Sequence, residues 1–216
     1  MKWEKVICMA HSMGAIISLF YNYVYPGRIA AMVLLDPGPA LNFYYFVNYE
    51  HNAWYQYVYE QYYTYYQRYN SSKKKLYSHE DAVTLTAGNR NLTEEQAKVI
   101  LSRSLEAEGD NYSFSMDPRM KYLSNIPVAE DTIRKVIISN ILPTLVLVAS
   151  IDNSNEPAKS FALNILQNCT GSKNYSHIEV TGGHDFHITN PSAAATHVKK
   201  FLADINCYVK NILCKI

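Results

Sequence analysis

Short apolar runs near the start of the chain alternate with a stretch of helical spacing. Residues 5–9 (KVICM) are followed by a small-residue turn and by GAIISLFYNYVY, whose apolar positions recur at helical intervals. Pro26 and Gly27 end this helix, and residues 31–35 (AMVLL) predict a second buried strand before the breaker DPGP. A strand, a helix and a strand in this order predict a parallel sheet and an α/β core.

The same pattern returns near the C-terminus. Residues 144–149 (TLVLVA) and 177–180 (HIEV) predict two further strands, which are separated by the helical run FALNILQN. A final helix is expected from residue 193 to about residue 212. We therefore assign residues 1–40 and 141–216 to one α/β core.

The intervening residues 41–140 lack this alternation and are expected to form a helical insertion. It contains NLTEEQAKVILSRSL, a helix that either Asn91 or Thr93 can cap. Between residues 43 and 69 tyrosine is so frequent that helical and strand periods cannot be separated, and we expect helix because no turn residues interrupt it. This segment is either a surface that packs over the core or an aromatic wall of a substrate pocket or lipid contact.

Composition and charge narrow the class of protein. The chain has 216 residues, of which 48% are hydrophobic, and 20 basic against 19 acidic residues give a net charge of +1. This balance predicts no binding of nucleic acid, and no run approaches the roughly 18 apolar residues of a membrane span. The first ten residues lack the apolar core of a secretion signal, so we expect a cytoplasmic or other intracellular protein. The four cysteines have no zinc-site or disulfide spacing, and no metal or cofactor is expected.

The turn AHSMG, residues 10–14, lies between the first strand and its helix, where a nucleophile elbow belongs. Small residues on both sides of Ser12 allow the strand and helix backbones to approach, although Ala10 replaces the usual first glycine. Ser12 is the candidate nucleophile, and the backbone N–H of Met13 is the expected oxyanion donor. The alternative is an ordinary strand-to-helix turn.

A serine nucleophile needs a base, and the base needs an acid. His184 follows the last predicted strand after two glycines and is the candidate base, with His187 as the alternative and a structural loop histidine as the remaining possibility. Asp152 follows the strand TLVLVA and is the candidate acid, which gives the chain order Ser12, Asp152, His184. Asp36, at the end of the strand AMVLL, is the alternative acid.

Several segments together resemble one known family. These are KWEKVICMAHSMGAIISLFY, YPGRIAAMVLLDPGP, LYSHEDAVTLTAGNRNLTEEQAKVILSRSL, YSFSMDPRMK, ILPTLVLVASIDN and VTGGHDFHITNPSAAATHVKKFL. They are similar to the serine hydrolase-like proteins of the α/β-hydrolase superfamily. The resemblance implies an α/β-hydrolase fold, a helical cap over the active site, and Ser12, Asp152 and His184 at the positions of nucleophile, acid and base.

The sequence departs from this family at its beginning. Members of the superfamily have several strands and an HG-type loop before the elbow strand, whereas here the elbow strand begins within a few residues of Met1. We therefore expect a truncated sheet with missing N-terminal strands, no second oxyanion donor from that loop, and an apolar edge that favours aggregation or pairing.

The main hypothesis is a serine hydrolase of carboxylic ester or related acyl substrates. The alternatives are a catalytically impaired protein that binds a ligand or partner, and a lipase-like lid at residues 43–69 that docks on membranes. The oligomeric state is not given by the sequence.

Overall fold

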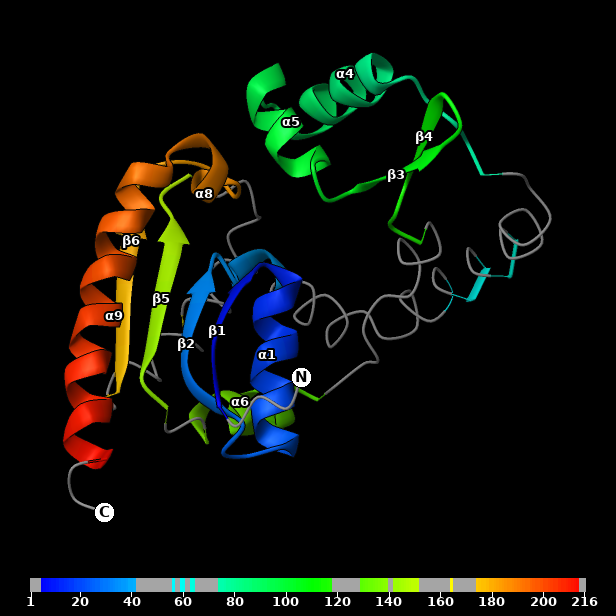
Figure 1. The fold of residues 1–216 in the computed structure, drawn as a ribbon. Coiled ribbons are helices and arrows are strands. Elements are labelled where there is room, and N and C mark those ends of the chain that lie inside the picture. The colour runs from blue at the N-terminus through cyan, green and yellow to red at the C-terminus, as the bar shows by residue number, and fades with distance from the viewer. Residues whose placement is uncertain are drawn as a thin grey trace. The chain divides into compact units, whose positions relative to one another are not determined.

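The computed structural model describes residues 5–41, 56, 59–60, 63–64, 74–117, 129–139, 142–151, 164 and 174–213. Contacts divide the chain into two units, one of Met1–Tyr49 with Pro127–Ile216 and the other of Glu50–Ile126. Figure 1 shows the elements of both units.

The first unit is built on a four-stranded sheet. Its strands are β1 (Val6–His11), β2 (Ile29–Leu35), β5 (Thr144–Ala149) and β6 (Tyr175–Val180), in the order β1-β2-β5-β6. All three pairings are parallel. The sheet confirms the α/β class and the four strands that the hydropathy pattern predicts.

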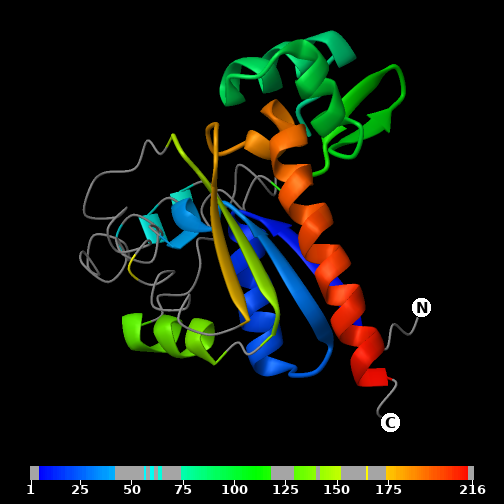
Figure 2. The ribbon, with the colours of Figure 1, turned by 90° about the vertical axis from the view of Figure 1, so that its left-hand side faces the viewer.

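Helices cover both faces of this sheet. One face carries α1 (Met13–Val24) and α6 (Glu130–Ile138), and the other carries the long α9 (Pro191–Leu213) (Figure 2). The side chains of β2 alternate accordingly. Met32 and Leu34 belong to the α1–α6 core, while Val33 and Leu35 belong to the core on the α9 side, and all four are buried.

The α6 helix belongs to the first unit, although its residues precede the boundary that the sequence suggests at residue 141. Ile133, Val136 and Ile137 of α6 are buried in the same cluster as α1 and the sheet. Their spacing of three and one positions places them on one side of the helix. The sequence contains this apolar side, but without a neighbouring strand it gives no sign of which unit the helix belongs to.

The second unit contains α4 (His79–Arg90), α5 (Glu94–Leu101), β3 (Leu105–Glu108) and β4 (Asn111–Phe114). Thr93 caps α5 in a capping box with Gln96, which selects Thr93 over Asn91. The expected helical insertion also contains two strands, β3 and β4, which pair as an antiparallel hairpin. Gly109 adopts φ 65°, a turn conformation that glycine permits at little cost, and so allows the chain to reverse.

One edge of the core sheet carries exposed apolar side chains. In the described part of the chain β1 pairs with β2 alone, and Val6, Ile7 and Met9 are exposed. Met9 is in register with Val33, which belongs to the core on the α9 side, yet Met9 itself is exposed. The apolar edge expected from the sequence is therefore present in the structure.

Two sequence expectations fall outside what the structure shows. The tyrosine-rich stretch of residues 43–69 lies mostly outside the described residues, as does most of the FALNILQN run. No helix in the described ranges combines the length and apolar character that crossing a membrane requires.

Candidate active site

The turn between β1 and α1 has the conformation of a nucleophile elbow. Ser12 lies between the end of the strand at His11 and the start of the helix at Met13, with φ 53° and ψ −121°. Its backbone N–H donates to the carbonyl of Leu35 on β2 at 2.9 Å. A positive φ at a serine is strained and persists where surrounding structure imposes it, as the strand-to-helix elbow does.

Ala10 and Gly14 lie opposite each other in the elbow. A Cβ placed on Gly14 would lie 3.7 Å from the Cβ of Ala10, at ordinary contact distance. The alanine at the position of the usual first glycine is thus accommodated opposite Gly14. Met13 is the first residue of α1, so its backbone N–H belongs to the first turn, where N–H groups have no partner within the helix.

A carboxylate and an imidazole meet at the same end of the sheet. Oδ2 of Asp36 lies 2.6 Å from Nδ1 of His184. The other carboxylate oxygen, Oδ1, accepts from the backbone N–H of Ala149 at 3.0 Å. The Asp36 side chain is 5% exposed and that of His184 is 37% exposed, so the carboxylate is buried beneath a ring that solvent or a ligand can reach.

Asp36 is held by the backbone as well as by its side chain. It follows the last residue of β2, has φ 42°, and donates its N–H to the carbonyl of Leu147 at 2.7 Å. Since Leu35 is in register with His11, the next residues in the two strands are Asp36 and Ser12. Both residues therefore leave the sheet at the carboxyl ends of adjacent parallel strands, where α/β proteins bind their ligands.

The loop that carries His184 follows β6 and is hydrogen-bonded to the segment that follows β5. The N–H of Ile151 donates to the carbonyl of Gly182 at 3.0 Å, and the N–H of Gly182 donates to the Ser150 hydroxyl at 3.1 Å. Gly182 has φ 139°, and a Cβ there would lie 3.1 Å from the Cβ of Phe186. Of the two glycines singled out in the sequence, Gly182 is the one whose conformation and close contact the loop requires.

His11 lies between two other histidines. Its Nε2 donates to the backbone carbonyl of His184 at 2.9 Å, and its ring centroid is 4.4 Å from that of His184 and 4.2 Å from that of His187. Burial lowers the pKa of His11, an effect larger than the opposing one of the hydrogen bond to the His184 carbonyl. The ring is thereby favoured in its neutral form.

The structure brings together some of the expected residues. Asp152 lies outside the described residues, so its role as the acid stays a prediction, and the described carboxylate bonded to His184 is Asp36, the alternative. His187 lies beside His11, and Asp36 is paired with His184 instead. Among the described residues the Ser12 hydroxyl makes no hydrogen bond to His184. Such bonds are often long without substrate.

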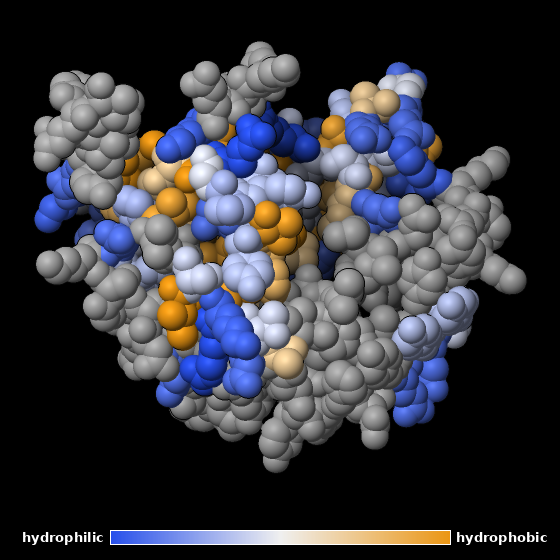
Figure 3. Space-filling view, turned by 90° about the horizontal axis from the view of Figure 1, so that it is seen from below, coloured by the Kyte–Doolittle hydropathy of each residue, from blue (hydrophilic) through white to orange (hydrophobic). Residues whose placement is uncertain are grey.

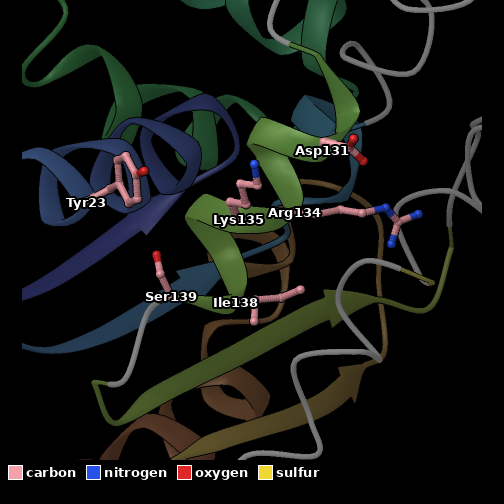
Figure 4. Close-up of a pocket in the computed structure, with 6 residues that line it drawn as sticks. All are labelled: Tyr23, Asp131, Arg134, Lys135, Ile138 and Ser139. Carbon is pink, nitrogen blue, oxygen red and sulfur yellow. The ribbon is translucent and has the colours of Figure 1, made fainter.

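A surface hollow of about 530 Å³ lies elsewhere in the first unit, between α1 and α6 (Figure 4). It is lined by Tyr23, Asp131, Arg134, Lys135, Ile138 and Ser139. Val24 and Ile138 are exposed, and the view from below in Figure 3 shows hydrophobic surface between hydrophilic patches. None of the elbow, carboxylate or histidine-loop residues lines the hollow, so it is separate from the candidate active site.

Comparison with known protein families identifies the family of this chain. A family described as having the alpha/beta hydrolase fold matches residues 1–191, which include the elbow, Asp36 and His184. The chain belongs to the α/β-hydrolase family. The sheet topology and the elbow geometry agree with this membership, which confirms the family inferred from the sequence segments.

Individual relatives of this α/β hydrolase are distant. A serine hydrolase-like protein of Danio rerio is 24% identical over 211 residues, which cover 94% of this chain and 62% of the relative. A hypothetical protein of Pseudomonas aeruginosa has a TM-score of 0.65 at 18% identity, over 94% of this chain and 68% of that one. A thioesterase domain from the curacin biosynthetic pathway has a TM-score of 0.61 at 18% identity, over the same shares. The chain thus spans less than two thirds of its curated relative, and the solved structures support the fold.

Proposed function

We propose that this chain is a serine hydrolase of carboxylic esters or related acyl compounds. The observation that carries the proposal is the 2.6 Å contact between Asp36 and His184 at the sheet end where the strained elbow presents Ser12. In the proposed reaction the Ser12 hydroxyl oxygen attacks the acyl carbon. Nε2 of His184 accepts the hydroxyl proton and returns it to the leaving group, and water then hydrolyses the acyl-enzyme by the same route.

Asp36 is the acid that we propose. A hydrogen bond to Nδ1 fixes the tautomer in which Nε2 has the lone pair to accept a proton, and Asp36 makes that contact. Its second oxygen is already bound to the N–H of Ala149, so the carboxylate cannot turn away from the ring without losing a buried hydrogen bond. Asp152 remains the acid expected from the sequence.

The oxyanion donor that we propose is the N–H of Met13. It belongs to the first turn of a 12-residue helix, where unpaired N–H groups and the helix dipole both favour negative charge. One oxyanion donor contributes about 10²- to 10³-fold to the rate in comparable sites. The proposed chemistry requires no metal or cofactor.

The substrate class rests on chemistry and on relatives. A serine nucleophile with a histidine base suits acyl transfer, and one structural relative is titled a thioesterase domain. Esters and thioesters both present an acyl carbon and a leaving group that His184 can protonate. We propose this class of small-molecule substrate without choosing its acyl chain.

Labelling with a fluorophosphonate probe tests the proposal. The purified 216-residue chain is incubated with the probe, and the modified peptide is identified by mass spectrometry, with Ser12→Ala as the matched control. Stoichiometric labelling confined to Ser12 is expected, because only an activated hydroxyl reacts readily. If a folded sample stays unlabelled, the hydrolase proposal fails, and a protein that binds a ligand without catalysis becomes the better hypothesis.

A further inference from the structure

Three potential metal ligands converge next to the elbow. One side-chain ligand atom from each of His11, Asp185 and His187 lies within 4.8 Å of the other two. His11 ends β1, whereas Asp185 and His187 belong to the loop and short helix α8 (Phe186–Thr189) that follow β6. The fold therefore brings together ligands that lie more than 170 positions apart in sequence.

The residue types suit a first-row transition metal. Two imidazoles and one carboxylate are a ligand set that zinc uses where it keeps a fourth position open for water or another ligand. Ligand atoms around a tetrahedral zinc are about 3.4 Å apart, given bonds of about 2.0–2.2 Å. From separations of up to 4.8 Å the ligand atoms would need to draw together by up to about 1.4 Å, which is within the reach of rotations about the side-chain bonds.

A second observation concerns the ring of His11. Its Nε2 donates to the carbonyl of His184, which leaves the lone pair of the neutral ring on Nδ1. Metal-binding histidines commonly donate their other ring nitrogen to a backbone carbonyl in this way, which fixes tautomer and orientation. The ring contacts of 4.2 Å with His187 and 4.4 Å with His184 restrict it further.

We propose that His11, Asp185 and His187 form a binding site for a divalent transition metal, with Zn²⁺ as the representative ion. Asp185 supplies a carboxylate oxygen and the histidines one ring nitrogen each, and the fourth position is open. His11 precedes Ser12, and Asp185 follows His184. Because the His11 ring lies 4.4 Å from the His184 ring, we expect an ion at the site to hinder the approach of a substrate to the proposed base.

Equilibrium binding of Zn²⁺ to the whole chain tests the site. Titration against a chromophoric zinc chelator at neutral pH gives the affinity of the wild-type chain and of His11→Gln, Asp185→Asn and His187→Gln. Each variant is expected to bind at least about tenfold more weakly, the lower bound for loss of even an outer partner of a metal site. His177→Gln, a half-buried histidine of the same unit, and His79→Gln, in the other unit, are controls expected to keep wild-type affinity.

Cobalt distinguishes this site from adventitious binding at cysteine. Co²⁺ bound to nitrogen and oxygen ligands gives visible absorption without the thiolate charge-transfer band that cysteine ligation produces. The proposal is overturned if the three variants bind Zn²⁺ as tightly as the controls, or if the Co²⁺ complex shows a thiolate band that disappears in a cysteine variant.

The blocking effect rests on the proposed hydrolase function and is tested separately. Saturating Zn²⁺ is expected to slow labelling of Ser12 by the fluorophosphonate at least tenfold, and a chelator is expected to restore it. Zinc binding without protection of Ser12 would leave the site in place and refute the blocking. If Ser12 is never labelled, the binding titration still decides whether the metal site exists, so failure of one proposal is distinguishable from failure of the other.

Discussion

Oδ2 of Asp36 and Nδ1 of His184 lie 2.6 Å apart, although 148 positions separate the two residues along the chain. Asp36 follows β2 with a positive φ, and its carboxylate is buried. One carboxylate oxygen contacts the imidazole of His184, and the other accepts a hydrogen bond from the N–H of Ala149. A buried carboxylate without partners would carry a large desolvation cost. The contact therefore orients the ring and satisfies the acid at the same time.

Replacing Asp36 with asparagine tests its role as the acid. Asparagine has nearly the same size, tolerates a positive φ and can still accept the Ala149 N–H, so the fold is expected to persist. The amide cannot favour the required tautomer or stabilise the charged imidazole. We expect the rate of Ser12 labelling to fall by a factor on the order of 10⁴, the size found when the acid of a comparable triad is amidated.

Asp152→Asn is the matched comparison for this experiment. If Asp36 is the acid, the Asp152 variant keeps labelling within about tenfold of wild type. A large loss in Asp152→Asn with little change in Asp36→Asn would reverse the assignment and support the acid predicted from the sequence. Circular dichroism and thermal unfolding of both variants exclude a loss caused by misfolding.

A second prediction concerns the glycine before the histidine loop. Gly182→Ala places a methyl group at φ 139° and 3.1 Å from the Cβ of Phe186, so both backbone strain and a steric clash are expected. A residue held in such a region costs on the order of 1–3 kcal/mol. The variant should unfold at lower urea concentration and label more slowly at Ser12, because the loop that carries His184 must shift.

Gly183→Ala is the control for the loop. No atom outside the adjoining residues lies within 4 Å of the position its Cβ would take, and its φ is outside the range that strains an alanine. We expect stability within about 0.5 kcal/mol of wild type, as for an ordinary surface substitution. Equal losses in the two variants would show that loop flexibility, and not the conformation of Gly182, determines the stability.

The sequence predicted the core better than the connections. Runs such as TLVLVA are short, mostly apolar and rich in β-branched residues, which is typical of a buried parallel strand, and β5 occupies residues 144–149 as expected. The hairpin of β3 and β4 is not visible in the sequence because its two strands are only four residues long and lack an apolar run. Asp36 ranked second because an Asp-Pro pair after a strand is also an ordinary turn signal, and only the fold shows which carboxylate the histidine meets.

The hydrogen bond between His11 and the carbonyl of His184 also cannot be predicted from the sequence. His11 stands beside the candidate nucleophile in the sequence, but its hydrogen bond to the His184 carbonyl depends on how β1 and the loop after β6 approach each other. No local spacing encodes that approach. A histidine beside a candidate nucleophile and an Asp-x-His triplet after the base were the available signals.

The exposed edge of the core sheet gives a third prediction. An unpaired strand with apolar side chains favours association with another chain. Met9→Lys places a charge on a side chain that is 53% exposed, so the fold should tolerate it. In sedimentation analysis over a range of concentrations we expect the wild-type chain to self-associate and the variant to do so at least about tenfold more weakly. Val99→Lys, at a position 63% exposed on α5, is the control and should leave association unchanged.

Acidification is expected to destabilise the first unit in part through His177. Burial lowers the pKa of His177 on β6, and its Nε2 is buried without a hydrogen bond in the described part of the chain. The unfolded chain, with a pKa of about 6.5, therefore takes up a proton more readily than the folded chain. The stability associated with the neutral ring is fully present above the unfolded pKa and is lost as the pH falls through the lower, folded pKa.

Urea unfolding of the wild type and His177→Gln between pH 8 and pH 5 measures this contribution. Glutamine does not titrate, so the free energy of unfolding of the wild type should fall more steeply with decreasing pH than that of the variant. His11, whose pKa burial also lowers, contributes in the same direction to both proteins and cancels in the difference. A difference between the two proteins that stays constant from pH 8 to pH 5 would show that His177 is equally easy to protonate in the folded and unfolded chains.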